Sequence, residues 1–413
     1  MKEKKVVIVG AGFGGVRTTL DLAKWNLRNV KIILISPRPH FEYHAALYRV
    51  VTGSSPLEVC VPLREIFKKT NVELVEDTIQ SVDLRQQRLI GQEGQVYSYD
   101  YVVLSLGSET AFFHIPGLEE HAFGLKSIHE ALALKRHFHE VFTTCQRGSA
   151  DEKVCAAHVL IIGGGASGVE IAGQLGIYLK ALAEQHGLDE ELITIDLIEA
   201  APRLLPFLPP GVSAKVKRRL HKLGVKIFLN RTVVKQEVEE VFLKDLEMKT
   251  KTLIWTAGAK PNQLYVQTEG LDLDKKGRVL VNSQLLTPPW ENVFVLGDAA
   301  ATPYSGTALT ALDHGRVVAQ VLEKILGRGN LPTYKPKTHI FSIPIGPGWA
   351  ASGGKHLVVY GWLGWLVRRW LDLRFFLSIL PPRKAWLAFR SGKQLVESCP
   401  FCSKVDSCTG LYG

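Results

Sequence analysis

The sequence predicts an α/β protein built from two Rossmann-like domains, the second inserted in the first, followed by an amphipathic helical region. Two glycine-rich turns, which begin at Gly10 and Gly163, each stand between an apolar run and a helical stretch. The third observation is a segment near the C-terminal end that begins at Trp362 and is rich in tryptophan, leucine and arginine. Its composition differs from that of the preceding α/β segments, which predicts a separate unit.

The first glycine-rich turn has the spacing of a dinucleotide-binding loop. In "VVIVGAGFGG" an apolar strand leads into Gly10, Gly12, Phe13 and Gly15, and the helical stretch "VRTTLDLAKW" follows. The first glycine permits the tight turn, the second lets the backbone approach a pyrophosphate, and the third packs helix against strand. A chance glycine-rich turn is the alternative, but the flanking strand and helix favour dinucleotide binding, with the pyrophosphate at the helix N-terminus.

A second copy of this pattern carries Gly163, Gly165 and Gly168 in "HVLIIGGGASGVEIAGQL". The next apolar strand ends at Glu199, in "ITIDLIEAAPRLLP". A carboxylate there accepts hydrogen bonds from adenosine ribose hydroxyls and repels a 2′-phosphate, which favours NADH over NADPH. In the first copy the equivalent strand "VKIILIS" ends at Ser36, a weaker acceptor than a carboxylate, and Arg38 is either an additional ligand or a solvent-exposed side chain.

A later motif predicts how the far end of a dinucleotide is held. The apolar stretch "NVFVLGDAAA" ends in Gly297 and Asp298, and a helical segment follows near Thr307 and Ala308. An aspartate there can hold the ribityl or phosphate end of a long dinucleotide. Free N–H groups at the helix N-terminus suit a ring that carries negative charge, as reduced flavin does.

Taken in order, these motifs resemble the flavoproteins with two dinucleotide-binding domains, and specifically the type II NADH dehydrogenases, which are non-pumping NADH:quinone oxidoreductases. The resemblance also includes "DYVVLSLGS" and "LIWTAGAKPN", and it spans almost the whole chain. It implies that the first glycine turn binds FAD, the second binds NADH, and Glu170 lies near the meeting point of nicotinamide and flavin. The alternative for Glu170 is a carboxylate favoured by the helix dipole.

The residues expected to contact the two cofactors follow from the motifs and the resemblance together. For FAD they are Gly10, Gly12, Phe13, Gly15, Ser36, Gly107, Gly297, Asp298, Thr307 and Ala308; for NADH they are Gly163, Gly165, Gly168, Glu199 and Gly258. The expected domains are residues 1–113 and 294–334 for FAD, 114–293 for NADH, and 335–413 as the C-terminal region.

The chain departs from the family pattern where the electron acceptor should bind. The family helix has two glutamines at positions that correspond here to Leu309 and Asp313. Leu309 cannot form a hydrogen bond with a quinone carbonyl, and an ionised Asp313 cannot donate one. His314 is a possible donor or a packed helix residue. Two electron acceptors are therefore considered. The first is a membrane quinone. The alternative is a small oxidant or a protein, as in an NAD(P)H flavin reductase or diaphorase that works on the soluble side.

Cysteine usage disfavours the disulfide-using branch of the same superfamily. No cysteine pair follows Gly15, and Cys60 stands alone. Cys145 and Cys155 do not match the sulfide:quinone reductase pattern, which leaves that activity as a minor alternative. Cys399, Cys402 and Cys408 near the end lack a fourth ligand for zinc, so we expect no metal site. A non-catalytic redox sensor that binds NADH is a third class of function.

The C-terminal segment predicts attachment to a membrane surface. On a helix its apolar side chains share one face, and Arg368, Arg369 and Asp372 gather on the opposite side. These mid-segment charges exclude spanning and suit a helix lying in the interface. The alternatives are a core helix and the seam of a homodimer. The apolar face comprises Trp362, Leu363, Leu366, Trp370, Leu373 and Leu377, and "PPRKAWLAFRSGKQL" repeats the composition.

Charge and composition agree with this interpretation. The net charge is +10 over 413 residues, and residues 355–413 carry nine Lys/Arg against three Asp/Glu. A basic, tryptophan-containing end suits an anionic surface, and we favour phospholipid headgroups over nucleic acid. The absence of a signal peptide pattern and the sparse cysteines predict a peripheral protein on the cytoplasmic face of the cell membrane.

Overall fold

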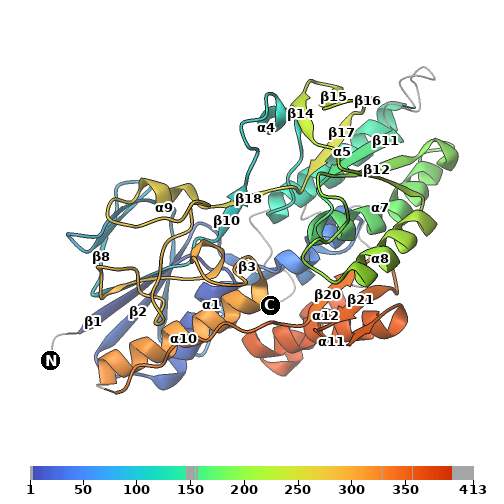
Figure 1. Cartoon of the computed structure of the whole chain (residues 1–413). Coiled ribbons are helices and arrows are strands. Elements are labelled where there is room, and N and C mark those ends of the chain that lie inside the picture. Colours follow the sequence, from blue (N-terminus) through green and yellow to red (C-terminus); the bar gives the residue numbers. More distant parts are fainter. Residues whose placement is uncertain (1–2, 146–153, 155–156, 328, 356, 393–413) are drawn as a thin grey trace.

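The structure is a computed structural model of the chain, and it describes residues 3–145, 154, 157–327, 329–355 and 357–392. Two α/β halves lie side by side, and the C-terminal elements pack along one side of them (Figure 1). Each half is built on a parallel sheet. The α/β architecture with two Rossmann-like units is therefore confirmed.

The first half is a five-stranded parallel sheet. Its order is β19 (Val293–Val295), β9 (Tyr101–Leu104), β1 (Lys4–Val9), β2 (Val30–Ser36) and β5 (Val72–Glu76). Residues Val6–Val9 are buried, as expected for a strand covered on both faces. Helix α1 (Phe13–Trp25) packs on α10 (Ala308–Gly327) so closely that a Cβ on Gly315 would lie 2.6 Å from the Gly14 carbonyl oxygen.

The other face of this sheet is covered partly by residues that the sequence assigns to the second domain. The antiparallel strands β6 (Ile79–Asp83), β7 (Arg88–Gly91) and β8 (Val96–Ser98), which belong to the predicted first domain, also lie on this face. Leu264 and Tyr265 of α9 (Gln263–Gln267) and Val279 share one apolar cluster with Val7 and Val9. The chain thus returns to the first half near residue 262, earlier than the predicted boundary at 293.

The second half is a four-stranded parallel sheet in the order β13 (Val225–Leu229), β12 (Thr194–Glu199), β11 (His158–Ile162) and β17 (Thr252–Trp255). The helices α7 (Ala166–Gln185), α8 (Pro210–Lys222) and α5 (Ile128–Cys145) belong to this half. A small antiparallel sheet is formed by β14 (Val233–Gln236), β15 (Glu240–Leu243) and β16 (Glu247–Lys249).

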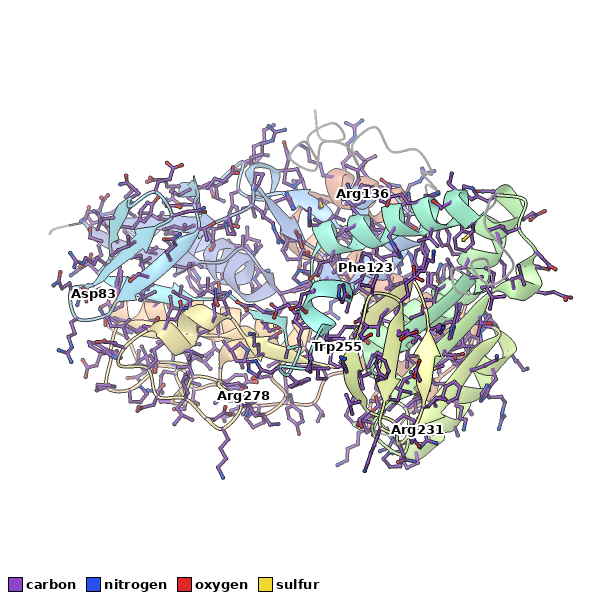
Figure 2. The ribbon with its side chains drawn as sticks, turned by 90° about the horizontal axis from the view of Figure 1, so that it is seen from above. Asp83, Phe123, Arg136, Arg231, Trp255 and Arg278 are labelled. Carbon is purple, nitrogen blue, oxygen red and sulfur yellow. The ribbon has the colours of Figure 1, made fainter. Side chains whose placement is uncertain are left out.

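Two antiparallel strands, β10 (Ser108–Thr110) and β18 (Ala259–Pro261), connect the halves. Seen from above, Phe123 and Trp255 lie beside this connection (Figure 2). The Trp255 indole N–H donates to the Ala111 carbonyl at 2.8 Å, and its backbone N–H donates to Phe123 at 2.8 Å. Satisfied buried donors of this kind fix the path of both crossing strands.

The C-terminal region forms a small sheet and two helices. The strands are β20 (Phe341–Pro344), β21 (Ala350–Gly353) and β22 (Val358–Val359), and the helices are α11 (Trp362–Ile379) and α12 (Pro382–Ser391). No helix within the described residues is long and apolar enough to cross a membrane. The remaining short elements are β3 (His40–Glu42), α2 (Leu47–Val51), β4 (Cys60–Pro62), α3 (Leu63–Ile66) and α4 (Leu118–His121).

Helix α11 exposes its apolar face and buries its charged face. Its apolar face is exposed, with Trp362 65% and Trp370 53% accessible, whereas Arg368 is 6% and Asp372 0% accessible. The predicted separation of the two faces is correct. The charged face does not turn toward solvent; Arg368, Arg369 and Asp372 point into the protein.

Candidate active site

The first glycine turn has the geometry of a diphosphate-binding loop. Gly10 has φ +101°, a conformation that favours glycine, and a Cβ on Gly15 would lie 1.9 Å from the Gly10 carbonyl oxygen. Nothing lies within 4 Å of a Cβ placed on Gly12. The backbone at Gly12 is therefore open to a ligand at the N-terminus of α1. Phe13, the first residue of α1, lies edge-on to Phe41 with ring centroids 5.1 Å apart.

The second glycine turn repeats this geometry. Gly163 has φ +109°, and a Cβ on Gly168 would lie 1.8 Å from the Gly163 carbonyl oxygen. A Cβ on Gly165 would again meet nothing within 4 Å. Each turn thus joins a central parallel strand to a helix, β1 to α1 and β11 to α7. The second helix N-terminus offers the same opening for a diphosphate.

Glu199 lies at the carboxyl end of β12, beside the second turn. One carboxylate oxygen accepts the Gly164 N–H at 2.5 Å and the other accepts the Ala201 N–H at 2.7 Å. Each oxygen retains lone pairs for further hydrogen bonds. Arg203, the nearest arginine along the chain, donates instead to the Leu208 carbonyl at 2.7 Å and to Ser213 at 2.9 Å. This arrangement suits ribose hydroxyls better than a 2′-phosphate.

Ser36 occupies the equivalent end of β2 in the first half and is buried. Its hydroxyl accepts the Arg38 N–H at 3.3 Å. The Arg38 guanidinium turns toward Glu42, with which it forms an ion pair. Glu42 also contacts His40 and His44, each at 3.4 Å, and although burial opposes ionisation these partners hold the pKa of Glu42 well below its ordinary value.

Gly297 and Asp298 follow β19, as the sequence predicts. Gly297 has φ +74°, and Asp298 accepts a hydrogen bond from Ser108 at 2.7 Å. The Lys126 ammonium donates to the same Ser108 hydroxyl at 2.9 Å. The Asp298 carboxylate therefore sits where β10 and β18 connect the two halves.

His314 stabilises the loop that contains Gly297 and Asp298. Its Nδ1 accepts the Gly297 N–H at 3.1 Å, and its Nε2 lies 3.2 Å from the Thr302 hydroxyl. Burial lowers the pKa of His314 to about 4, so the ring is neutral at pH 7. Both ring nitrogens are occupied, and the residue supports the loop rather than facing an acceptor.

The N-terminus of α10 lies next to the Asp298 loop. Helix α10 begins at Ala308, and the Thr307 hydroxyl accepts the Thr310 N–H at 3.2 Å. Leu309 packs against the main apolar cluster. Asp313 is buried and pairs with Arg316 at 2.8 Å and with Lys337 at 3.0 Å. Asp313 therefore anchors the segment that leads from α10 toward the C-terminal region.

Gly107 and Gly258 flank the two connecting strands. Gly107 has φ +69° and an open Cβ position, whereas a Cβ on Gly258 would lie 2.5 Å from the Phe113 ring. The Gly258 carbonyl accepts the Ala111 N–H at 3.2 Å. Both glycines thus permit a close backbone approach, Gly107 toward an open space and Gly258 toward Phe113.

Glu170 lies in the first turn and a half of α7, and its side chain is 13% accessible. Its carboxylate is 3.8 Å from the Arg368 guanidinium of α11. Burial raises the pKa of Glu170 to about 7, although Arg368 and Arg49 oppose this shift. A carboxyl that titrates near neutral pH can gain or lose a proton during turnover.

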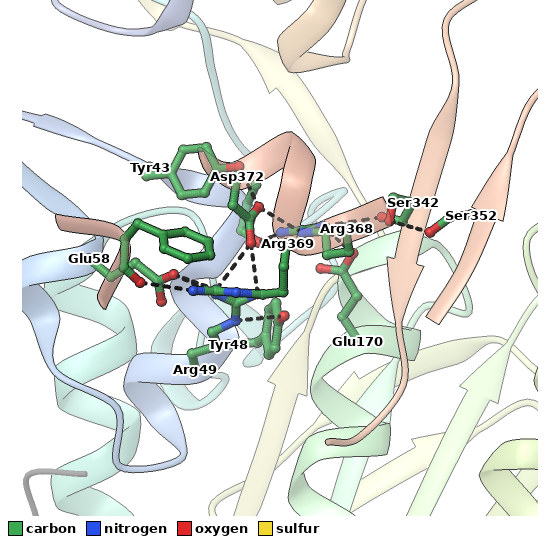
Figure 3. Close-up of polar contacts among 12 residues, drawn as sticks. Tyr43, Tyr48, Arg49, Glu58, Glu170, Ser342, Ser352, Arg368, Arg369 and Asp372 are labelled. Atoms are coloured by element: carbon green, nitrogen blue, oxygen red, sulfur yellow. Dashed lines mark hydrogen bonds and ion pairs between the residues drawn. The ribbon is translucent and has the colours of Figure 1, made fainter. Parts of the chain in front are cut away.

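Around Glu170 the structure brings together a set of charged side chains that we call the buried ion cluster (Figure 3). Arg49 Nη1 lies 2.6 Å from Glu58, and its Nη2 lies 3.1 Å from Asp372. Arg368 Nε lies 2.9 Å from Asp372. Burial opposes ionisation of Asp372, but the three arginines outweigh it and hold its pKa below the ordinary value. The members are Arg49, Glu58, Glu170, Arg368, Arg369 and Asp372.

Two tyrosines complete this region. The Tyr43 hydroxyl donates to Asp372 at 2.8 Å, and the Tyr48 hydroxyl accepts from Arg49 at 3.0 Å. The sequence motifs do not include Tyr43, Tyr48, Arg49 or Glu58. The available signal was a run of aromatic and charged residues in "HFEYHAALYRVV", next to apolar residues that predict burial. The α11 partners of Tyr43, Arg49 and Glu58 are more than 300 residues away, so the pairing could not be predicted.

The structure describes two of the six cysteines. Cys60 in β4 and Cys145 at the end of α5 are both buried. Cys155, Cys399, Cys402 and Cys408 lie outside the described residues. Among the described residues, no group of three or more His, Cys, Asp and Glu side chains could hold a metal ion.

Comparisons with known proteins agree with this geometry. The type II NADH:quinone oxidoreductase of Staphylococcus aureus (strain bovine RF122 / ET3-1) is 28% identical over 338 residues, which cover 78% of this chain and 83% of that protein. NDH2 from Plasmodium falciparum in complex with NADH has a TM-score of 0.85 at 18% identity, with 95% and 98% of the two chains covered.

The sulfide:quinone oxidoreductase from Aquifex aeolicus has a TM-score of 0.76 at 19% identity, with 97% and 94% covered. At such identities the two structural similarities show the fold alone. The family model described as pyridine nucleotide-disulphide oxidoreductase matches residues 4–315, which include both glycine turns and the Asp298 loop. The chain therefore belongs to the pyridine nucleotide-disulphide oxidoreductase family.

Proposed function

We propose that this protein is an FAD-dependent NADH dehydrogenase that passes electrons from NADH to a membrane quinone without pumping protons. The observation that carries the proposal is the pair of diphosphate-binding turns, each with an open backbone at its second glycine, Gly12 and Gly165. The relatives named type II NADH:quinone oxidoreductase support the same activity.

The donor side follows from Glu199 and α7. Glu199 would accept hydrogen bonds from the adenosine ribose, and the N-terminus of α7 would hold the pyrophosphate of NADH. On the other side, Gly10, Gly12 and Gly15 would hold the FAD pyrophosphate, and Asp298 would bind its ribityl end. When bound, FAD accepts a hydride and releases electrons singly or in pairs, as quinone reduction requires.

Glu170 is the titratable group that we assign to proton handling. Oxidation of NADH by a quinone takes up one proton, because the quinone gains two hydrogens and NADH supplies one hydride. Hydride transfer itself needs no acid or base from the protein. The pKa of about 7 lets Glu170 hold a proton at neutral pH and release it in the course of turnover.

Attachment to a membrane explains the exposed apolar face of α11. We call this the outer face; it comprises Trp362, Leu363, Leu366, Trp370 and Leu377, all at least 45% accessible. Helix α12 adds Trp386 and Leu387, which are 48% and 44% accessible. A contiguous apolar surface of this kind suits the interfacial region of a bilayer, where the quinone is also dissolved. Peripheral attachment to the membrane follows from this face, and we propose that it takes place at the cytoplasmic face of the cell membrane.

The test is a visible spectrum of the purified full-length chain. We expect a bound flavin that NADH bleaches in the absence of oxygen and that a ubiquinone or menaquinone analogue restores. A protein that retains no flavin even when refolded with FAD contradicts the whole proposal. A flavin that NADH bleaches but neither quinone analogue reoxidises contradicts the quinone half alone.

The second candidate is an NAD(P)H diaphorase with a non-quinone acceptor. It is favoured by Leu309 and Asp313, because Leu309 has no hydrogen-bonding group and Asp313 is bound by Arg316 and Lys337. Ferricyanide or another soluble oxidant would then restore the flavin spectrum when the quinone analogues do not. Such an enzyme would also have no need of the exposed outer face.

A further inference from the structure

A long stretch of the second half carries positive charge without any compensating acid. Residues 200–236 contain nine Lys/Arg and no Asp or Glu. Five of the nine lie on α8, whose sequence ends "AKVKRRLHK". Among the described residues, the ion pairs of this stretch are Arg231–Asp245 and Lys235–Glu237, and both lie outside α8. The helix therefore presents cations with no acidic partner there: Lys215, Lys217, Arg218, Arg219 and Lys222.

Helix α8 lies directly beside the start of the outer face. The Lys215 ammonium is 3.9 Å from the centroid of the Tyr360 ring, two residues before α11 begins. The Arg219 guanidinium lies 5.9 Å from the Trp349 ring, and its Nε donates to the Ile345 carbonyl at 3.3 Å. Figure 1 shows α8 next to β21 and above α11. Lys215 and Arg219 thus fix α8 against the C-terminal region.

The remaining cations of α8 are exposed. Lys217, Arg218, His221 and Lys222 line a shallow open hollow on the helix surface together with Ala214. Two of the three arginines of α11, Arg368 and Arg369, are buried and cannot serve as surface cations, whereas Arg374 is exposed. On α12, Arg383 and Arg390 are exposed. Positive charge therefore flanks the apolar outer face on α8 and on α12.

We propose that α8 binds anionic phospholipid headgroups while the outer face enters the adjacent apolar layer. Apolar burial and headgroup electrostatics add in interfacial binding, and each Lys or Arg near an anionic surface contributes. The inference rests on the membrane attachment proposed above and adds its lipid selectivity: the protein binds bilayers that contain anionic lipid more tightly than zwitterionic ones. It also assigns to the NADH-binding half a direct contact with the membrane.

The experiment is co-sedimentation of the full-length protein with two kinds of vesicle, phosphatidylcholine alone and phosphatidylcholine mixed with phosphatidylglycerol. The test variant is Lys217→Gln, Arg218→Gln, Lys222→Gln, which leaves the ring contacts of Lys215 and Arg219 in place. We expect binding to the mixed vesicles to weaken on the order of a hundredfold at low salt, from the per-residue contribution of surface cations. Binding to phosphatidylcholine alone should change little.

A matched control removes three exposed cations from the first half: Arg85→Gln, Lys275→Gln, Lys276→Gln. This control should bind the mixed vesicles like the unmodified protein, and both variants should keep normal NADH bleaching of the flavin. Equal binding of the α8 variant and the control to mixed vesicles overturns the proposal. So does an α8 variant that loses affinity for nucleic acid while retaining that for vesicles. If the unmodified protein binds neither kind of vesicle, the membrane attachment itself fails, irrespective of α8.

Discussion

Glu170 connects the second glycine turn with the C-terminal helix through one carboxyl group. It lies two residues after Gly168 and contacts Arg368 at 3.8 Å. Burial disfavours its charged form and Arg368 favours it, and the balance places the pKa near 7. Small changes in the surroundings of this carboxyl therefore change its protonation at physiological pH.

The first prediction concerns the pH dependence of acceptor reduction. If Glu170 must carry a proton in that step, the rate falls about tenfold per pH unit above about pH 7, because the protonated fraction falls by that factor above the pKa. Flavin reduction by NADH should show no such decline. Rapid-mixing kinetics of the two half-reactions over this pH range measures both, and Glu170→Gln should abolish the pH dependence. An unchanged profile in Glu170→Gln removes Glu170 from the proton step.

Substitutions of Glu199 and Ser36 test which of the two proposed sites binds NADH and which binds FAD. Glu199→Gln replaces a charged acceptor by a neutral one, so the KM for NADH should rise about tenfold, as the loss of a charge-assisted hydrogen bond implies, while flavin content stays constant. Ser36→Ala is the counterpart and should lower flavin retention without changing that KM. Flavin absorbance per protein and steady-state kinetics give both quantities. Loss of flavin in Glu199→Gln would mean that the two sites are exchanged.

At the scale of elements, α11 has two different partners. Its charged side completes the buried ion cluster, where Asp372 contacts Arg49, Arg368 and Arg369. Its apolar outer face is largely exposed, and the Arg374 guanidinium of the same helix lies over the Trp370 ring. The hydroxyls of Ser342 and Ser352, 2.6 Å apart, connect β20 with β21, and Ser352 donates to the Gly364 carbonyl at 2.8 Å, which secures the start of the helix. The helix is thus fixed to the protein by these polar contacts together with the buried side chains of Phe375, Phe376 and Ile379.

Removing Arg368 should destabilise the protein and alter Glu170 together. Arg368→Gln leaves Asp372 with one cation fewer in a buried site, which costs about 3 kcal/mol or more. Arg374→Gln is the control on the same helix, because Arg374 is exposed and stacks on Trp370 at 5.2 Å. It should cost less than about 0.5 kcal/mol. Urea midpoints compare the two variants.

The same substitution has a second consequence that a purely structural role would not produce. Arg368 opposes the upward shift of the Glu170 pKa, so its removal should raise that pKa further. The decline in acceptor reduction should then begin at higher pH in Arg368→Gln than in the unmodified protein. A profile that stays in place would show that Arg368 only supports the fold.

At the scale of the whole molecule, two parallel sheets are joined by β10 and β18, and the C-terminal region packs on both halves. Arg368 contacts Glu170 of the second half, and Asp372 contacts Arg49 of the first. A deletion from residue 355 onward would therefore remove Asp372 and Arg369, which pair with Arg49 and Glu58, as well as the outer face. Such a truncation tests the fold and not membrane attachment.

Membrane release is better tested by substitutions on the outer face. Trp362→Ser, Trp370→Ser, Leu377→Ser removes apolar surface without touching the ion cluster, so the protein should leave the membrane fraction with its flavin retained. Each buried Trp or Leu contributes about 2 kcal/mol to interfacial binding, which makes the expected loss for the three together on the order of ten thousandfold. Fractionation and vesicle binding measure it. A triple variant that changes oligomeric state and leaves membrane binding intact would identify the face as a dimer seam.

The glycine turns were predictable because their chemistry is local. A side chain on Gly15 or Gly168 would collide with the carbonyl of Gly10 or Gly163, five residues earlier, and Gly10 and Gly163 themselves have positive φ, so the local sequence pattern carries the geometry. The start of α10 at Ala308 was predictable because it also depends on residues that are close in the sequence. The roles of His314 and Asp313 were not, because their partners Gly297 and Lys337 lie 17 and 24 residues away across turns of unknown path.

The sequence by itself determined the two Rossmann-like folds, the positions of their glycine turns and the separation of apolar and charged faces on α11. These depend on periodicity and spacing within short segments. Only the tertiary structure decided that the charged face of α11 is the buried one and that it meets Glu170. Burying arginines is favourable only with acidic partners in place, and Glu58, Glu170 and Asp372 come together from three distant segments of the chain.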